Sequence, residues 1–381
     1  MAVSVARHSL STTRGSGWWS CGEGTQTRPA NGPWREDTVT QAWSTTKGVS
    51  AIAAAKLVEQ GHLDYKKLVK DYWPEFAQNG KANVTVEMLL SHQAGLATMG
   101  GASVSLEEYK NDWKKVEKIM AAAAPEYPPG RSVGYHALTF GMYVDALIRR
   151  ADPKHRNLTQ FFQDEIAKPF GIDFFIGLPR EQAWRAARGH LITSVEFFSL
   201  LLDTDHRYLI WNMLTSSDEL FTKSGKAISG FDMDTSNDLT KLDVGVGSTM
   251  GFGAAGPLAK LYDYLANGGT IGKKQLLPKK IVDLFSTPLT ASLPSAHGKS
   301  LPEITFSQGF MVLPQKDSVL VGHSGYGGQQ AYADLHYKVG IAYVTNFHSP
   351  RMISPPDNYL ELAKVFYECF EKQRAKANTS S

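Results

Sequence analysis

The sequence predicts an α/β (α+β) protein in which an antiparallel sheet is flanked by helices and interrupted by a helical insertion. Three observations lead to this fold class. Strand-like runs gather beyond residue 300, with one more at the start of the chain. Residues 105–225 read mostly as helices broken by Pro and Gly, and an amphipathic pattern closes the chain. A sheet built late in the chain, with helices in the middle, fits a layered α+β architecture.

In the first half of the chain, residues 2–6 alternate between valine and a smaller side chain, a pattern that fits a short strand. The run "WSTTKGVSAIAAAKLVEQG" predicts a helix from about Ser44 to about Gln60, which Gly61 ends. "LLSHQAGL", residues 89–96, predicts a helix that ends in a Gly-containing turn, and a further helix begins after Tyr135 and closes at Arg149-Arg150. Breakers divide the middle of the chain at Pro128-Pro129-Gly130, Pro169-Phe170-Gly171 and Gly177-Leu178-Pro179.

The sequence changes character near residue 241. "DVGVGSTMGFGAAG", residues 243–256, is a Gly-rich loop that leads into a helix over Pro257–Asn267. Four strands are predicted after it, at Phe306–Val312, Ser318–Val321, Gln330–Leu335 and Val339–Asn346. The closing helix places on one side the residues Leu362, Val365, Phe366, Cys369 and Phe370. We therefore divide the chain into a sheet-containing part, residues 1–60 and 241–381, and a mainly helical part, residues 61–240.

The composition of the 381 residues is that of a globular protein, with 42% apolar and 20% charged residues. Lys and Arg number 40 against 37 acidic residues, without a long basic run, so no nucleic-acid or anionic-membrane partner is expected. The two cysteines, Cys21 and Cys369, form no CxxC pair and predict neither a disulfide framework nor a zinc cluster.

Targeting signals are weak. No apolar stretch approaches the roughly 20 residues of a spanning helix, and the start of the chain lacks the apolar run of a secretory signal. These features predict a cytoplasmic protein. The acid-free start with Arg7 and Arg14 keeps organelle import as an alternative, and the oligomeric state stays open.

Ser44-Thr-Thr-Lys47 is the first motif with chemical meaning. At a helical repeat Lys47 shares a face with small apolar residues, whereas Lys56 lies on the polar side where a solvated lysine belongs. A buried ammonium is costly unless it is paired or loses its proton. A lysine with a lowered pKa, three residues from a serine, could accept the Ser44 proton. The alternative is a helix-capping serine beside a lysine that reaches water, and spacing alone does not decide between them.

Two further stretches are candidates for the same site. Tyr135 follows a Pro/Gly turn at a helix start, and near an ammonium the pKa of its phenol is expected to fall. "VGHSGYGG", residues 321–328, could bring His323, Ser324 and the Tyr326 backbone N–H to a ligand. The alternatives are a core aromatic for Tyr135 and a tight hairpin turn for the glycine stretch.

Cofactor and metal sites are not predicted. The Gly-rich loop at 243–256 lacks a preceding hydrophobic strand and a following acidic residue at the distance that a dinucleotide ribose requires. The eleven histidines include no HExxH pattern and no His-x-x-x-His pair.

Five motifs together resemble those of the serine beta-lactamase-related hydrolases, the family of class C beta-lactamases, penicillin-binding proteins and small-ester esterases. They are "STTKG" at Ser44, "YWPEF" at Tyr72, "LLSHQAGL" at Leu89, "YHALTFG" at Tyr135 and "GHSGYGG" at Gly322. The resemblance runs from about Pro33 to about Asn346 and looks closest to the esterase-like branch and to the animal beta-lactamase domain-containing proteins. It implies a beta-lactamase/transpeptidase-like fold in which both parts of the chain form one catalytic unit.

The resemblance also implies residue roles. Ser44 would be the nucleophile, Lys47 its base partner and Tyr135 the first residue of the second motif, sharing the proton transfer. The backbone N–H groups of Ser44 and Tyr326 would form the oxyanion hole. Four residues would bind substrate, namely His136, His323, Ser324 and Gly325.

Three departures from the family pattern are visible. Ala137 stands where the second motif usually has Asn, and His323 stands where penicillin-binding members have Lys. His323 is mostly neutral at pH 7, and its protonation below about pH 6 would restore a cation. The family starts with two adjacent strands, and residues 8–32 fit the second strand poorly.

We therefore expect a serine hydrolase that forms an acyl-enzyme on Ser44 and acts as a carboxylesterase on small esters. The expected partner is a small-molecule ester or amide. One alternative is a structural or scaffolding protein that keeps the fold with little or no turnover. A further alternative is a beta-lactamase or a peptidase.

Overall fold

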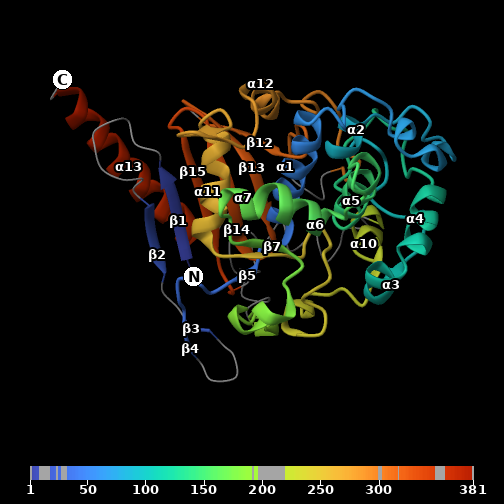
Figure 1. Cartoon of the computed structure of the whole chain (residues 1–381), viewed down its shortest axis with the longest axis horizontal. Helices are drawn as coiled ribbons and strands as arrows, with labels where there is room; N and C mark the ends of the chain where they lie inside the picture. The colour runs from blue at the N-terminus through green and yellow to red at the C-terminus, as the bar shows by residue number, and fades with distance from the viewer. Residues whose placement is uncertain are drawn as a thin grey trace.

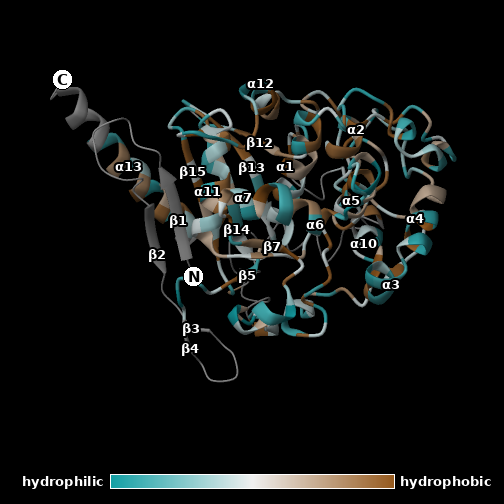
Figure 2. Cartoon of the chain, in the orientation of Figure 1, coloured by the Kyte–Doolittle hydropathy of each residue, from teal (hydrophilic) through white to brown (hydrophobic). Residues whose placement is uncertain are grey.

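The computed structural model describes residues 2–7, 18–22, 25–26, 32–190, 193–195, 219–298, 303–315, 317–347 and 357–379. The predicted fold class is confirmed, because an antiparallel sheet packs against helices and a largely helical region extends from it (Figure 1). Figure 2 shows hydrophilic residues mainly along the periphery, for example on α3 (Leu106–Asn111) and α12 (Lys279–Val282). Among the described residues, no helix has the length and apolar character that a membrane crossing requires.

The main sheet has six strands in the order β12-β13-β14-β15-β1-β2. The strands are β12 (Met311–Pro314), β13 (Val319–Gly325), β14 (Gln329–Asp334), β15 (Val339–Val344), β1 (Ala2–Arg7) and β2 (Trp18–Gly22). All neighbours are antiparallel, and β1 lies between β15 and β2, so strands from both ends of the chain share this sheet. The expectation that residues 8–32 fit a second strand poorly is wrong, because Trp18–Gly22 pairs with β1 along its length.

Two long helices cover the faces of the sheet. Helix α11 (Ala255–Ala266) packs closely on β15, where a Cβ at Gly340 would lie 2.2 Å from the Ala259 carbonyl oxygen. Helix α13 (Asp357–Thr379) lies on the opposite face, and its Tyr359 and Phe370 pack with Val339, Ile341 and Tyr343 of β15.

The predicted packing face of this closing helix is only partly right. Phe366 and Phe370 face the sheet, but Leu362, Val365 and Cys369 are exposed. Tyr359 and Tyr367 share the sheet-facing side with these two phenylalanines, and the Tyr367 hydroxyl donates to Asp334 Oδ2 at 2.8 Å.

Helix α1 (Thr46–Glu59) passes through the centre of the molecule and is preceded by the short helix η1 (Trp43–Thr45). Residues 46–55 are all buried, so α1 has no solvated face along this length. Lys56, which the sequence predicts to be solvated, is also largely buried. Its side chain is only 13% exposed and forms an ion pair with Glu59.

Helix α5 (Thr139–Ala151) and the Gly-rich loop pack against α1. A Cβ at Gly141 would lie 2.1 Å from the Ser248 backbone nitrogen, so the absence of a side chain lets this loop approach α5. The loop thus serves close packing in the core.

The remaining elements are short. They are β3 (Thr25–Gln26), β4 (Gly32–Pro33), β5 (Thr40–Gln41), η2 (Val69–Asp71), η3 (Pro74–Ala77), α2 (Val86–Leu90), β6 (Val104–Ser105), α4 (Trp113–Ala122), α6 (Leu158–Phe162), η4 (Gln163–Ala167), α7 (Lys168–Phe170), β7 (Phe174–Ile176), η5 (Arg180–Arg185), α10 (Glu219–Ser224), β8 (Ile228–Ser229), η6 (Thr235–Asn237), β9 (Gly251–Gly253), β10 (Thr270–Ile271), β11 (Lys274–Gln275), η7 (Asp283–Ser286) and η8 (Tyr326–Gly328). The region predicted to be mainly helical, residues 61–240, also holds the short strands β6, β7 and β8. Strand β7 forms a small sheet with β9 and β5, which lie outside this region.

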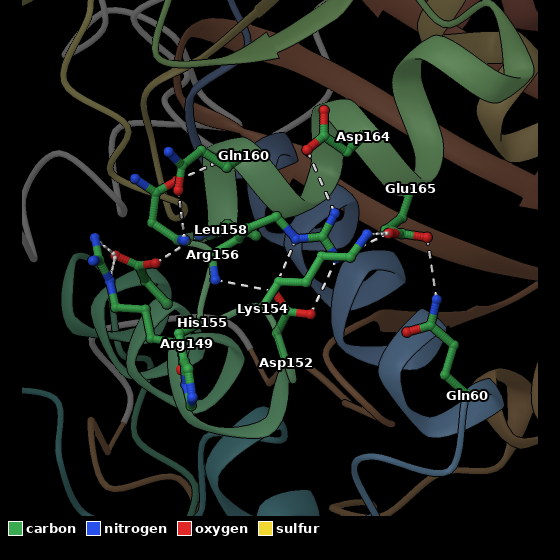
Figure 3. Close-up of polar contacts among 12 residues, drawn as sticks. Gln60, Arg149, Asp152, Lys154, His155, Arg156, Leu158, Gln160, Asp164 and Glu165 are labelled. Carbon is green, nitrogen blue, oxygen red and sulfur yellow. Dashed lines mark hydrogen bonds and ion pairs between the residues drawn. The ribbon is translucent and has the colours of Figure 1, made fainter.

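An ionic network holds the far end of α1 (Figure 3). The Arg156 guanidinium bonds to Asp152 at 2.8 Å and to Glu165 at 2.8 Å. Glu165 in turn accepts a hydrogen bond from the Gln60 side chain at 3.2 Å. The network joins the connection between α5 and α6 to the C-terminal end of α1, and it thereby braces the helix that follows Ser44.

Candidate active site

Ser44 lies in a tight, strained turn at the start of α1. The preceding residue, Trp43, is buried and has a left-handed φ of 47°, which costs a non-glycine residue about 1–2 kcal/mol. The Trp43 ring packs edge-on against Tyr326 and Phe231, with centroids 5.1 and 6.0 Å apart. This packing holds the turn, and Ser44 itself remains partly exposed.

Lys47 is fully buried and faces the Ser44 hydroxyl, so its predicted burial is confirmed. Its Nζ lies 3.0 Å from Ser44 Oγ, 2.8 Å from the Ala137 carbonyl oxygen and 3.1 Å from the Ser248 carbonyl oxygen. Burial lowers the pKa of Lys47 well below its usual value.

An ammonium would donate to all three partners of Lys47, whereas an uncharged amine would donate to two of them and keep its lone pair for the third. Carbonyl oxygens only accept hydrogen bonds, so Ala137 and Ser248 take the two N–H groups of the amine. The remaining position is the nitrogen lone pair, which then faces the Ser44 hydroxyl. A protonated Lys47 donates to Ser44 Oγ. If Lys47 is uncharged, its lone pair accepts the Ser44 proton instead, which is the geometry a nucleophile needs with its base.

Tyr135 completes a triangle with these two residues. Lys47 Nζ lies 4.8 Å from the centroid of the Tyr135 ring, and a hydrogen bond joins the Tyr135 side chain to Ser44. Burial raises the pKa of the Tyr135 phenol well above its usual value, although the bond with Ser44 opposes the rise. The expected fall in this pKa is therefore wrong, because burial penalises the charged phenolate.

The Gly-rich loop supplies part of this site. Its Ser248 hydroxyl donates to the Leu138 carbonyl oxygen at 2.7 Å, and Ser50 of α1 donates to the Gly247 carbonyl oxygen at 2.6 Å. These bonds fix the loop so that the Ser248 carbonyl oxygen reaches Lys47. The sequence analysis excluded a dinucleotide site at this loop and gave it no role in the active site. Its closely spaced glycines indicate close packing and could have pointed to it.

The end of β13 lies against the Ser44 turn. A Cβ at Gly325 would lie 2.5 Å from the Ala42 carbonyl oxygen, so only glycine lets the strand approach this closely. Thr45 Oγ1 donates to the His323 carbonyl oxygen at 3.3 Å. Together with the contact between the Trp43 and Tyr326 rings, these features place the Tyr326 backbone near that of Ser44.

His323 and Ser324 are placed differently from their expected roles. The His323 imidazole is fully buried, and burial, with a smaller effect of Lys47, lowers its pKa to about 3. The expectation that His323 becomes a cation below about pH 6 is therefore wrong. The Ser324 hydroxyl bonds to Gln330 Oε1 at 2.9 Å and to the Tyr332 hydroxyl at 2.6 Å, both on the neighbouring strand β14.

His136 does not serve as a substrate-binding side chain, which corrects the sequence expectation. It is fully buried, and burial lowers its pKa to about 3. Its Nε2 accepts the Leu96 backbone N–H at 3.0 Å, and its Nδ1 lies 2.5 Å from the Gly134 carbonyl oxygen. Both ring nitrogens are thus bonded to backbone.

Two more histidines, which sequence reasoning did not single out, hold the backbone at Tyr135. His297 Nε2 accepts the Tyr135 backbone N–H at 2.8 Å, and His92 Nδ1 accepts the His136 backbone N–H at 3.1 Å. His92 lies in the "LLSHQAGL" motif, which was a usable signal, whereas His297 lies in a segment without a recognisable pattern.

Tyr135 also lines a small cavity of about 60 Å³. Its lining includes Val133, Leu293, His297, Glu303 and Phe306. Across the described part of the chain, no group of three or more His, Cys, Asp or Glu side chains is arranged to hold a metal ion.

Comparisons with known proteins identify the family of the chain. A family model described as Beta-lactamase matches residues 1–365. The esterase/beta-lactamase LipL of Mycobacterium tuberculosis is 29% identical over 326 residues, which are 85% of this chain and 72% of that protein. A crystal structure of a family VIII carboxylesterase is 29% identical, with a TM-score of 0.75, and the match covers 92% of this chain and 88% of the other.

An animal relative matches over a shorter stretch. The human mitochondrial serine beta-lactamase-like protein is 33% identical over 110 residues, which are 28% of this chain and 18% of that protein. The family resemblance drawn from the five motifs is confirmed by the match over residues 1–365.

Proposed function

Because the chain belongs to the beta-lactamase family and is a serine hydrolase, we propose that it hydrolyses small carboxylic esters through an acyl-enzyme on Ser44. The observation that carries the proposal is the set of three partners around Lys47 Nζ. In an uncharged Lys47, the two carbonyl oxygens accept its two N–H groups, and its lone pair faces Ser44 Oγ, 3.0 Å away. This arrangement supports Lys47 as the base that activates Ser44.

Acylation begins when Ser44 Oγ attacks the ester carbonyl carbon and its proton passes to the Lys47 amine. The carbonyl oxygen becomes an oxyanion, which we assign to the backbone N–H groups of Ser44 and Tyr326. Each donor of this kind lowers the free energy of the transition state by about 3 kcal/mol. The close approach of Gly325 to Ala42 supports this pairing of the two backbones.

The bond to the leaving alcohol then breaks. Tyr135 keeps its proton at neutral pH because burial raises its pKa, so it donates that proton to the departing oxygen. The Lys47 ammonium returns a proton to Tyr135 and becomes an amine again. In deacylation, water gives a proton to Lys47 as it attacks the acyl carbon. The Lys47 and Tyr135 pair then returns a proton to Ser44 Oγ as the bond to the acyl carbon breaks, and the acid is released.

The substrate is proposed to be a neutral ester in preference to a beta-lactam. Penicillin-recognising relatives hold the substrate amide and carboxylate with an Asn and a cation, and this chain has Ala137 and His323 there. His323 stays neutral because its pKa is about 3. Losing an amide hydrogen bond and a charged one weakens beta-lactam turnover about a hundredfold, and a neutral ester needs neither.

A fluorophosphonate probe separates this function from an inactive scaffold. We expect the probe to label the purified protein at Ser44, and a short-chain aryl ester to be hydrolysed by the wild type and not by Ser44→Ala. The variant should keep the thermal unfolding midpoint of the wild type. An unlabelled wild type without ester hydrolysis would instead support a structural role for the fold.

A further inference from the structure

We propose that His92, His136 and His297 form an uncharged histidine clamp that positions the turn Tyr135–Ala137. The clamp rests on the proposed function, because this turn carries two groups of the proposed machinery. The Tyr135 side chain is hydrogen-bonded to Ser44, and the Ala137 carbonyl oxygen lies 2.8 Å from Lys47 Nζ. A shift of this turn would disturb both contacts together.

Two of the histidines hold consecutive backbone N–H groups of the turn. His297 Nε2 accepts from Tyr135 at 2.8 Å, and His92 Nδ1 accepts from His136 at 3.1 Å. His297 is separated from Tyr135 by 162 positions in the sequence, so a distant loop fixes the turn. A ring nitrogen can accept only when it carries no proton, so each contact requires a neutral imidazole.

The third histidine ties the turn to the "LLSHQAGL" segment. His136 Nε2 accepts the Leu96 backbone N–H at 3.0 Å, and its Nδ1 donates to the Gly134 carbonyl oxygen at 2.5 Å. His136 thereby bonds both the residue that precedes Tyr135 and the segment that contains His92. The three rings therefore form one connected set of backbone bonds around Tyr135.

The clamp fixes the tautomer of each ring. His92 must carry its proton on Nε2, whereas His136 and His297 must carry theirs on Nδ1. His92 Nε2 has no hydrogen-bond partner among the described groups, so the function of this ring depends on Nδ1 alone. Aromatic neighbours hold the His92 ring in place: its centroid lies 4.4 Å from that of Phe306 and 5.0 Å from that of Tyr135.

Variants that keep or remove the accepting atom test this role. Asn places an oxygen where His92 has Nδ1, and Gln places one where His297 has Nε2, whereas Leu removes the acceptor. We expect His92→Leu and His297→Leu to lower kcat for a short-chain aryl ester at least tenfold, with KM changed less than threefold. His92→Asn and His297→Gln should recover kcat to within about threefold of the wild type. The exposed His62 serves as the control, and His62→Gln should leave kcat unchanged.

Two results would overturn the clamp. One is a kcat for His92→Asn and His297→Gln as low as that of the Leu variants in folded protein, because the accepting atom would then be irrelevant. The other is wild-type kcat in both Leu variants. If the Leu variants fail to fold, as judged by thermal unfolding, the Asn and Gln variants decide alone, and a kcat more than tenfold below that of the wild type in either of them would overturn the clamp.

A second measurement does not depend on activity. Nitrogen-15 chemical shifts of the imidazoles at pH 7 should show an unprotonated Nδ1 at His92 and an unprotonated Nε2 at His136 and His297. A protonated nitrogen at any of these three atoms would contradict the clamp. If the tautomers are as expected but the wild type hydrolyses no ester, the proposed function is wrong, whereas the hydrogen bonds of the clamp are confirmed.

Discussion

Lys47 and Lys81 are both fully buried, but only Lys47 has a hydroxyl among its three polar partners. Lys81 Nζ donates to the carbonyl oxygens of Gln78, Ala121 and Ala123, which satisfy all three N–H groups of an ammonium. Burial lowers the pKa of Lys81 only to about 8. Lys47 has two carbonyl partners, so its third position is free to act as a lone pair toward Ser44.

Lys81 should therefore be structural. We expect Lys81→Met to lower the free energy of unfolding by about 3 kcal/mol, because it leaves three buried carbonyl oxygens without their donor. The kcat of the folded fraction should stay within twofold of the wild type. Urea unfolding and ester hydrolysis on the same preparation measure the two effects, and a large loss of kcat without a loss of stability would contradict this assignment.

His323 should not add a pH-dependent preference for anionic substrates. With its pKa at about 3, it is neutral at both pH 5.5 and pH 7.5. The ratio of kcat/KM for a cephalosporin to that for a neutral aryl ester should therefore be the same, within about twofold, at the two pH values. A ratio that rises clearly at pH 5.5 would show that His323 titrates in this range.

Tyr135→Phe should distinguish esters by their leaving group. An alkoxide must be protonated as it departs, whereas a nitrophenolate leaves as the anion. We expect kcat/KM to fall about a hundredfold or more for an ethyl ester and only a fewfold for the nitrophenyl ester of the same acid. Equal losses for the two esters would assign Tyr135 to positioning Ser44 and not to proton donation.

Asp263 on α11 should make stability fall with rising pH. Burial raises its pKa to about 7, although it accepts bonds from the Gly340 backbone N–H and the Asn267 side chain. A raised carboxyl pKa stabilises the folded state at low pH, and this contribution is lost as the pH rises from about 4 through about 7. Between pH 5 and pH 8 the wild type should lose about 2.5 kcal/mol more stability than Asp263→Asn.

Urea unfolding of both proteins at the two pH values measures this difference directly. Any constant cost of the Asn side chain cancels in the comparison. A parallel pH dependence of the two proteins would mean that Asp263 ionises normally in the folded state.

Much of the fold could be predicted from sequence, because its signals are local. Strands β14 and β15 and helix α11 appear close to their predicted bounds, whereas β12 begins five residues later than predicted and β13 ends four residues later. The burial of Lys47 was also predicted, although the reason differs. α1 is buried on all sides near this residue, so the burial of Lys47 does not depend on one apolar face.

The surroundings of the site could not be predicted, because they depend on contacts between distant segments. His297 reaches Tyr135 across 162 positions, and the Ser248 carbonyl oxygen reaches Lys47 across 201. The pKa shifts of Tyr135 and His323 depend on burial, which no local pattern reveals. The role of His136 was misjudged for the same reason, since both its partners are backbone groups of a folded turn.

The central claim is that an uncharged Lys47 takes the proton from Ser44, and the rate of acyl-enzyme formation tests it most directly. With a nitrophenyl ester, a rapid-mixing burst should report acylation of the wild type, and intact-protein mass should show one acyl group on Ser44. Lys47→Arg keeps a positive charge but cannot accept a proton at working pH. The account predicts that folded Lys47→Arg acylates at least about a hundredfold more slowly, and acylation of this variant at the wild-type rate would contradict it.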